Sequence, residues 1–537
     1  MAKAAGRSFN ADIAAGTLAL CGIAGFVLAA IFPLLRIGSS GLTEVIFSAR
    51  TLYILQFTLW QAFLSTALSI LCAIPVASAL ARRPQFPGRI WIVRLMAAPM
   101  GLPALVGAFG ILAVWGRQGI LNDGLNALGF ERPISIYGLS GILVAHVFFN
   151  WPLAARLILA GLERLPPQYW RLSVSLGMGS WQIFRFVEWP AILRLLPGIA
   201  GLIFMLCATS FTLVLLLGGG PASTTLEVAI YQALKFDFDP PLAVALSLLQ
   251  VGLMGLLLAA LSLMPSAQED RALTQMGYRR YDGAGLSMRL LDGVFILALV
   301  VFCASPLVAV AAKGVSASIV DLTARPLFWR AAGTSALIAG SAALISVFLA
   351  YCLSVARFTL GENKAGYARL LSALMSGAGS LILVVPPVVL ATGWFLVLRG
   401  RGESLPIILV TIINALMALP FAIRVLEPAI VSHRLRVERL AQSLGILGLA
   451  RLRIVDWPVL RKPLAMGWAF AAALSLGDLG AVALFGGNQI VTLPWLMYSS
   501  LGSYRSDDAA AIAFLLAIIC LTLAIAGAPR GTQEKAI

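Results

Sequence analysis

Charged residues are scarce in this chain, and their scarcity excludes most classes of soluble protein. Asp, Glu, Lys and Arg make up 12% of the 537 residues, whereas apolar residues make up 60%. A soluble domain of ordinary composition carries about 25% charged residues, because they cover its surface. The composition is equally unlike that of a disordered or collagen-like chain. The chain is therefore suited to an apolar environment.

Residues that bind metals and nucleotides are scarce as well. The chain has six cysteines and two histidines, and the cysteines form no CxxC pair. These numbers exclude a disulfide scaffold and leave no ligand cluster for a metal or redox centre. The dipeptide Gly-Lys does not occur, so the chain lacks the GxxxxGK[ST] loop that holds nucleotide phosphates. We therefore expect no metal, no bound cofactor and no catalytic residues in this chain.

Long apolar runs dominate the sequence instead. A helix rises about 1.5 Å per residue and needs about 20 residues to cross about 30 Å of hydrocarbon. Twelve runs reach that length, and the only Asp, Glu, Lys or Arg within them is Asp478. They are 13–35, 51–81, 95–116, 133–155, 195–226, 240–268, 293–312, 331–356, 370–398, 404–423, 463–504 and 509–529. The short alternating segments of a β-barrel are absent. The sequence predicts an all-α polytopic membrane protein with about twelve transmembrane helices.

The loops between the runs indicate an orientation. Lys and Arg collect in short cytoplasmic loops, because moving them across the membrane is unfavourable. When the N-terminus is placed in the cytoplasm, most Lys and Arg fall in cytoplasmic segments, and the C-terminus is cytoplasmic too. The net charge of +16 then serves orientation and attraction to anionic lipid headgroups. No basic module with interleaved aromatic residues is present, so we expect no nucleic-acid partner.

One segment of the chain occurs twice. Residues 171–190 read RLSVSLGMGSWQIFRFVEWP, and residues 439–458, which lie 268 positions later, read RLAQSLGILGLARLRIVDWP. We call them the first and second repeated loops. The same offset pairs Pro152 with Pro420 and Arg156 with Arg424. The chain is thus predicted to contain two parallel six-helix repeats, related by an axis along the membrane normal. A translocation path is expected between them.

Each repeated loop is predicted to contain a short helix that leads into a membrane helix. Gly177 stands where a helix should end, and Ser180 is suited to cap the next one. Trp181 and Phe184 then share a face, as do Leu449 and Leu452 in the copy. A single such helix could simply rest on the bilayer surface. Two copies at equivalent positions favour a docking site for a partner with two-fold symmetry.

The spacing in these loops resembles the EAA loop of ABC importer permeases, in which Gly and the motif Ile-x-Leu-Pro are separated by nine residues. The matching residues are Gly177, Val187 and Pro190, and Gly445, Val455 and Pro458. Arg171 and Arg439 stand where the family has Glu. The resemblance implies that the loops, including Trp181, Phe184, Leu449 and Leu452, bind two copies of a cytoplasmic ABC ATPase, which use ATP and Mg. This chain is then a transport subunit and not an enzyme.

The family resemblance also suggests domain boundaries. Residues 1–50 are expected to form an N-terminal helix and an external loop. Residues 51–268 and 331–529 are expected to form the first and second permease domains. Residues 269–330 are expected to form a linker with the seventh transmembrane helix, and residues 530–537 a cytoplasmic tail.

The strings FGILAVWGRQG from Phe109, LGGGPASTTLEVAIYQAL from Leu217 and LGSYRS from Leu501 resemble bacterial permeases for thiamine and its phosphates. The resemblance implies a bacterial inner-membrane importer supplied by a periplasmic binding protein. Fused permeases for ferric iron share the layout of two loops and remain an alternative. An ion-coupled secondary transporter is an alternative of another class, but it would leave the repeated loops unexplained.

The sequence gives only weak signals for the residues that line the substrate path. An ionisable group in a membrane span costs about 2.5–3.5 kcal/mol and is a functional candidate for that reason. Asp478 is such a group, and the repeat places it opposite Ser210. Asp478 either accompanies a cationic substrate or caps a helix. His146, Asn150 and Asn414 are expected to form interhelical hydrogen bonds. The segment 218–239, with Glu227, Asp237 and Asp239, is a candidate docking site for the binding protein.

Overall fold

The computed structural model confirms the all-α membrane class. It describes residues 2–37, 42–130, 135–263, 280–283, 285–361, 365–379, 381–398, 405–446, 448–486 and 490–526, and within these ranges the chain forms helices and no strand. Ten helices in this part of the chain are long and apolar enough to cross a membrane. Two further helices belong to predicted spans: α20, a shorter apolar helix of 12 residues, and α23, which has 20 residues and carries Arg461 and Lys462.

Each half of the chain contains one set of helices. We call residues 1–263 the first half and residues 285–526 the second half. The first half contains α1 (Ala2–Ile37), α2 (Leu42–Ile46), α3 (Ala49–Arg82), α4 (Arg89–Leu95), α5 (Ala98–Gly101), α6 (Ala104–Trp115), α7 (Ile120–Ala127), α8 (Leu139–Glu163), α9 (Pro167–Ser175), α10 (Ser180–Ile183), the π-helix η1 (Phe184–Glu188), α11 (Trp189–Ala208), α12 (Thr212–Leu217), the 3₁₀ turn η2 (Pro221–Ser223), α13 (Leu226–Lys235) and α14 (Pro240–Ser262).

The second half contains α15 (Leu286–Ser316), α16 (Ile319–Thr323), α17 (Pro326–Gly361), α18 (Gly366–Ala378), α19 (Leu381–Val384), α20 (Pro387–Leu398), α21 (Leu405–Ser443), α22 (Gly448–Arg451), the π-helix η3 (Leu452–Asp456), α23 (Trp457–Leu476), α24 (Gly480–Phe485), α25 (Leu493–Gly502) and α26 (Ser506–Ala526). The repeat is visible in these bounds, because η3, α23 and α24 begin and end 268 residues after η1, α11 and α12.

Four of the twelve predicted runs are not continuous helices. The run 95–116 is divided between α4, α5 and α6, and 370–398 is divided between α18, α19 and α20. In the first of these runs, Leu102 has an extended backbone (ψ 134°) because the residue before a proline avoids the helical region. The runs 195–226 and 463–504 break after α11 and after α23. Such breaks are tolerated in a membrane where protein buries them or where they line a cavity.

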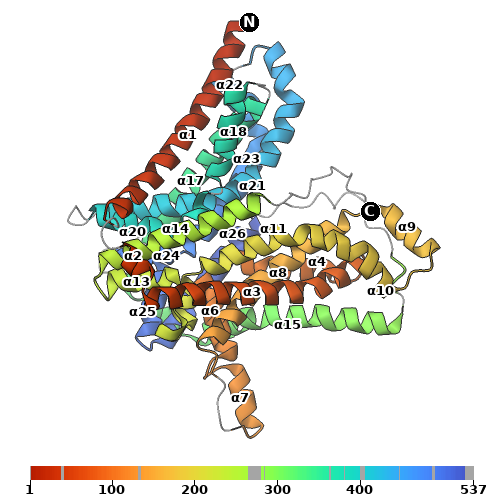
Figure 1. The fold of residues 1–537 in the computed structure, drawn as a ribbon, viewed down its shortest axis with the longest axis vertical. Coiled ribbons are helices and arrows are strands. Elements are labelled where there is room, and N and C mark those ends of the chain that lie inside the picture. The colour runs from red at the N-terminus through yellow and green to blue at the C-terminus, as the bar shows by residue number, and fades with distance from the viewer. Residues whose placement is uncertain are drawn as a thin grey trace.

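The two halves exchange their first helices. Helix α1 packs against α17, α18 and α20 of the second half, and α15 packs against α3, α4, α6 and α8 of the first half. The contact of α1 is close, because a Cβ atom added to Gly16 would lie 2.2 Å from Cβ of Ala356 in α17. Figure 1 shows α15 beside α3 and α6. Each half is therefore covered on one side by a helix that belongs, in sequence, to the other half.

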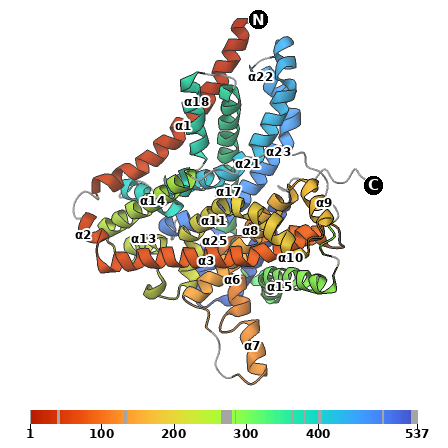
Figure 2. The ribbon, with the colours of Figure 1, turned by 45° about the vertical axis from the view of Figure 1, so that its right-hand side comes forward.

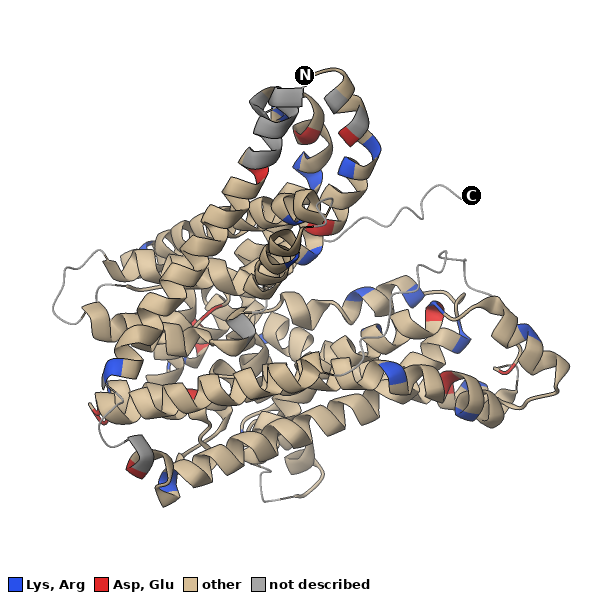
Figure 3. Ribbon diagram, turned by 45° about the horizontal axis from the view of Figure 1, so that its top comes forward, with Lys and Arg blue, Asp and Glu red and all other residues tan. Residues whose placement is uncertain are grey.

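The molecule has two arms that meet near one end. Figures 1 and 2 show α22 towards the tip of one arm and α9 and α10 at the tip of the other. Helix α13 of the first half contacts α20 and α24 of the second half where the arms meet, and Lys235 Nζ there donates to the carbonyl oxygen of Gly486 at 3.3 Å. Many charged residues gather near the tips of the arms, whereas the middles of the long helices are largely uncharged (Figure 3).

Candidate functional site

Glycine ends a helix in both repeated loops, as predicted. Gly177 and Gly445 have φ of 64° and 68°, in the left-handed region that side chains other than that of glycine rarely adopt. The N–H of Met178 donates to the carbonyl oxygen of Ser173, and the N–H of Ile446 donates to that of Ala441, its equivalent. The N–H of Gly177 also donates to the carbonyl oxygen of Val174. The first repeated loop thus has the complete Schellman pattern of bonds.

The prediction that Ser180 caps the next helix is wrong by one residue. Gly179 is the N-cap residue of α10, and its N–H donates to Oε1 of Gln182 at 2.9 Å. The hydroxyl of Ser180 donates instead to the carbonyl oxygen of Asp282, 2.5 Å away, in the segment that joins the two halves. A bond to a residue so distant in sequence could not be anticipated from local spacing.

The apolar face of the first repeated loop forms as expected. The ring centroids of Trp181 and Phe184 lie 5.6 Å apart, and Trp181 is 69% exposed. Leu172 and Leu176 on α9 are also exposed, as are their equivalents Leu440 and Leu444 in the second half. Leu452 is exposed, and Arg171 is exposed on α9. The side chains of Arg439 and Leu449 lie outside the described part of the structure. Exposed apolar groups on polar loops are typical of protein docking surfaces.

A π-helical turn joins each short helix to the membrane helix that follows. Val187 lies in η1 and Val455 in η3, and each turn leads without a break into α11 or α23, where Pro190 and Pro458 occupy the first turn. Because the helix is continuous here, each proline removes one intrahelical hydrogen bond and its ring crowds the preceding turn, which a π turn accommodates. Single π turns are rare and often occur at functional sites. They could not be predicted from the sequence, because nothing in the spacing distinguishes a π turn from an α turn.

Asp478 caps a helix in this structure. Its carboxylate accepts hydrogen bonds from the N–H groups of Gly480 at 3.2 Å and Ala481 at 3.3 Å, at the start of α24. Asp478 also lines a cavity of about 10 Å³ with Ser335, Asn414, Ser475 and Thr492, which has room for one water molecule. Ser210 is half-buried at the equivalent break, between α11 and α12. The geometry therefore favours the capping role of Asp478.

Asp478 either caps a helix or accompanies a cationic substrate, and two substitutions separate these roles. Asparagine caps a helix as well as aspartate does but carries no charge. We expect Asp478→Asn to leave uptake within about twofold of wild type, and Asp478→Ala to lower the melting temperature because it loses a cap worth about 1 kcal/mol. Uptake by purified protein in liposomes and thermal unfolding would be measured together. If Asp478→Asn abolished uptake at an unchanged melting temperature, the charge itself would serve the substrate.

The other polar residues in the spans join helices, as predicted. His146 Nδ1 lies 2.9 Å from Ser65 Oγ, and Asn150 Nδ2 donates to Cys207 Sγ at 3.3 Å. In the second half, Asn414 Nδ2 donates to Ser475 Oγ at 3.0 Å. All three bonds link the fourth membrane helix of a half to a neighbouring helix of the same half.

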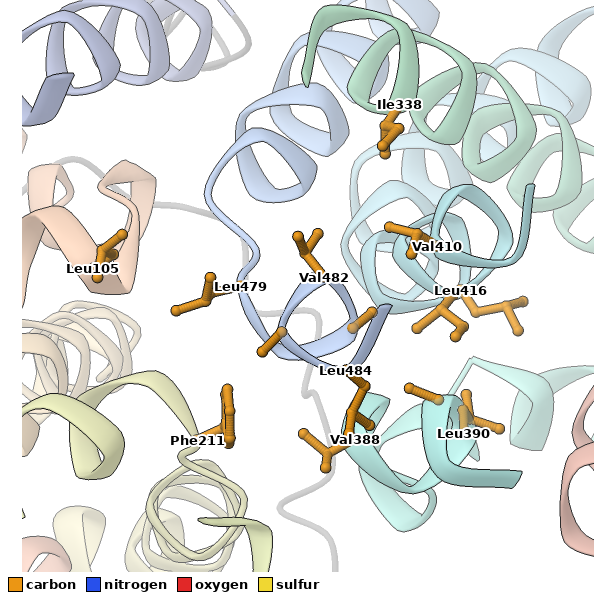
Figure 4. Packing of buried hydrophobic residues seen from close by; sticks show 14 of the residues in the cluster. Leu105, Phe211, Ile338, Val388, Leu390, Val410, Leu416, Leu479, Val482 and Leu484 are labelled. Atoms are coloured by element: carbon orange, nitrogen blue, oxygen red, sulfur yellow. The ribbon is translucent and has the colours of Figure 1, made fainter. Parts of the chain in front are cut away.

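The halves meet closely at the broken helices. A Cβ atom added to Gly477 would lie 2.8 Å from Cβ of Pro103, which precedes α6 in the first half. Leu479, Phe211 and Leu105 are buried in one apolar cluster next to this contact. Figure 4 shows Leu479 on the side of its loop that faces the elements carrying Leu105 and Phe211. Phe211 and Leu479 are 268 positions apart, so equivalent residues of the two halves belong to the same buried cluster.

The segment 218–239 offers less to a partner than expected. Glu227 is fully buried and Asp239 caps α14 by accepting from the N–H of Leu242, so neither is free to bind a protein. Asp237 remains partly exposed and pairs with Arg50 at 3.3 Å. Burial of Glu227 was not visible in the sequence, because α13 follows a Gly-rich stretch that looks like a surface loop.

Known proteins resemble the chain throughout its length. Residues 73–264 match the family of binding-protein-dependent transport system inner membrane components. A thiamine transport system permease protein of Brucella abortus is 45% identical over 95% of this chain and 93% of its own. The chain belongs to the family of these permeases.

Two further relatives support this assignment. The thiamine transport system permease protein of Escherichia coli K12 is 45% identical over 88% of this chain and 87% of its own, and that of Haemophilus influenzae is 38% identical over 87% and 86%. The permease is thus an integral inner-membrane component of a binding-protein-dependent ABC transporter, with two fused domains in one chain.

Proposed function

We propose that this permease is the membrane subunit of an ATP-driven importer that moves thiamine or its phosphates from a periplasmic binding protein into the cytoplasm. The paired repeated loops carry the proposal, because both present exposed apolar groups beside a glycine-ended helix and both continue into a membrane helix. The names of the relatives support thiamine as the substrate. In the proposed importer, both termini and both repeated loops lie in the cytoplasm.

Each repeated loop binds one copy of an ABC ATPase in this proposal. On the first loop the contact residues are Arg171, Gly177, Trp181, Phe184, Val187 and Pro190, and on the second they are Arg439, Gly445, Leu449, Leu452, Val455 and Pro458. ATP and Mg²⁺ are bound by the ATPase subunits, since this chain has no Gly-Lys dipeptide and so no phosphate loop of its own. The binding protein docks at the end of the molecule where the arms meet, opposite the arm tips.

The structure corresponds to a state open towards the cytoplasm in this proposal. The repeated loops are at separate arm tips, whereas the arms meet around Gly477 and Pro103. Closure of the two ATPases on ATP draws the loops together. Because η1 and η3 run directly into α11 and α23, that movement turns both fifth helices and separates Phe211 from Leu479. Substrate then enters past Ser210 and Asp478, and hydrolysis returns the arms to the state described here.

The proposal is tested by reconstituting the permease with its ATPase in liposomes and adding a panel of loaded binding proteins. We expect uptake of labelled thiamine, and stimulated ATP turnover, only with the thiamine-loaded protein and ATP. Parallel samples with thiamine monophosphate and diphosphate define the substrate range. A response to the ferric-loaded protein alone would identify an iron permease. Uptake driven by a proton or sodium gradient without ATP would identify a secondary transporter.

A further inference from the structure

Each repeated loop carries one buried acid immediately before the fifth helix of its half. In the second half this acid is Asp456, whose Oδ1 lies 3.0 Å from Nε2 of His433. Its Oδ2 lies 3.5 Å from Nε of Arg451 and 3.8 Å from Nη2 of Arg434. Arg451 also binds Glu438 at 2.6 Å. Within the described residues, the basic partners of this acid thus come from the second repeated loop and from α21 before it, and Arg434 also binds Asp12 of α1 at 2.7 Å.

The first half has the acid but not these bases. Glu188 is the equivalent of Asp456, and it is fully buried. The bases His433, Arg434 and Arg451 are replaced there by Leu165, Pro166 and Ile183, and Trp170 replaces Glu438. An ionised carboxylate without a partner in such a place would cost several kcal/mol. The first half therefore needs a positive charge from elsewhere.

Arg280 supplies that charge from residues 280–283, which we call the joining segment. Its Nη2 lies 2.5 Å from Oε1 of Glu188 and 2.6 Å from Oδ2 of Asp282. Its guanidinium lies 4.1 Å from the ring centroid of Trp170, a favourable cation–π distance. Arg280 thus contacts the equivalents of both acids that Arg451 contacts in the second half. Burial by itself would lower the pKa of Arg280, but hydrogen bonds to Asp282 and Glu188 and their charges raise it.

The joining segment also ties the first repeated loop to two membrane helices. Ser180 Oγ donates to the carbonyl oxygen of Asp282, and Arg83 Nη2 donates to that of Gly283 at 3.2 Å. Arg83, at the end of α3, also binds Asp292 of the exchanged helix α15 at 2.9 Å. These bonds connect the loop to α3 and α15, in addition to its connection along the chain to α11.

We infer that Arg280 is a positioning residue for coupling: it replaces, from the segment between the halves, the arginine that the first repeated loop lacks. This inference rests on the proposed function. The joining segment is consequently part of the machinery that transmits ATPase closure, and the two repeated loops transmit it by different routes. The first loop is held by the connection between the halves, whereas the second is held by α21, which Arg434 also joins to Asp12 of the exchanged helix α1 at 2.7 Å.

The test compares Arg280→Gln with Arg289→Gln, a matched control that removes the same charge from an exposed position in α15. In liposomes with ATPase and thiamine-loaded binding protein, we expect Arg280→Gln to lower thiamine uptake per ATP at least ~10-fold, since one partner of a buried ion pair is lost. The control should equal wild type. Adding Ile183→Arg to Arg280→Gln copies the second half, and should restore uptake per ATP to within about threefold of wild type.

Thermal unfolding of the purified permease provides a readout that does not depend on transport. Arg280→Gln should lower the melting temperature, and Glu188→Gln together with Asp282→Asn in the same chain should restore it, because both buried acids that pair with Arg280 are then neutral. If the wild-type protein failed to import thiamine, the proposed function would be refuted. The pairing of Arg280 with Glu188 could still be measured by thermal unfolding. The inference is overturned if Arg280→Gln melts early but keeps normal uptake per ATP in the folded fraction, or if Ile183→Arg gives no rescue.

Discussion

Replacing both Gly177 and Gly445 with valine is expected to reduce uptake at least ~10-fold while the permease still inserts in the membrane. A left-handed backbone costs an L-residue about 1–2 kcal/mol, and a β-branched residue is a genuine outlier there. Each 1.4 kcal/mol corresponds to a tenfold change in an equilibrium constant. Strain at both positions therefore favours loop conformations other than the one described here. ATP hydrolysis would continue without being coupled to transport. Uptake and ATP turnover in liposomes would be measured on the same samples.

Gly179 provides the matched control for this experiment. It lies two residues from Gly177 with an ordinary extended backbone (φ −73°, ψ 168°), and, like Gly177 and Gly445, it has no heavy atom within 4 Å of an added Cβ. Gly179→Val should therefore transport normally, although it adds the same bulk to the same loop. Any effect of the double substitution comes from backbone strain and not from collision. Normal uptake by the double variant would contradict the coupling role of the repeated loops.

The second large effect is expected from Gly477→Ala. The new methyl group would lie 2.8 Å from Cβ, 2.9 Å from Cα and 3.0 Å from Cγ of Pro103, a rigid ring that cannot turn away. Overpacking of this kind costs about 1–3 kcal/mol, which destabilises the state in which the arms meet at this point. We expect uptake to fall about tenfold. ATP hydrolysis should lose its dependence on the loaded binding protein, since the resting contact is weakened.

Gly467→Ala in α23, the helix that ends just before Gly477, is the control, because its added Cβ would have its nearest neighbour at 3.6 Å, an ordinary contact. Both variants would be compared by uptake, by ATP turnover with and without binding protein, and by thermal unfolding. Unchanged uptake in Gly477→Ala would mean that the contact between Gly477 and Pro103 persists, relaxed, throughout the transport cycle, and would remove it from the mechanism.

Periodicity and composition predicted the class of the fold well. Uninterrupted apolar runs identify membrane helices, because the hydrocarbon core leaves few other solutions. The repeat at 268 positions indicated two halves with the same order of elements, and the glycines at 177 and 445 marked the ends of helices. Each of these signals comes either from residues close together in the sequence or from the similarity between two segments of the same chain.

The breaks in the membrane helices were only partly predictable. Pro103 and Pro386 lie inside apolar runs, and the restriction that proline places on the preceding residue is a usable signal in two of the four interrupted runs. The breaks after Ala208 and Leu476 have no such mark. Apolar composition alone does not show whether a run of 30 residues is one helix or several.

Contacts between distant segments were beyond the reach of the sequence analysis. Arg280 lies 92 positions from Glu188, and nothing local indicates that they meet. One signal was present nevertheless. The alignment of the repeats shows an acid that keeps its place while its three basic partners become Leu165, Pro166 and Ile183. A buried charge that loses its partners in one copy implies a substitute elsewhere in the chain.

The exchange of first helices has a consequence for how the chain can be divided. Because α1 covers α17 and α20 while α15 covers α3 and α6, neither half is complete when it is made alone. Two fragments separated before residue 280 would each leave a long apolar flank uncovered, and would have to find each other in the bilayer. Synthesis as a single polypeptide keeps the two together at a fixed one-to-one ratio.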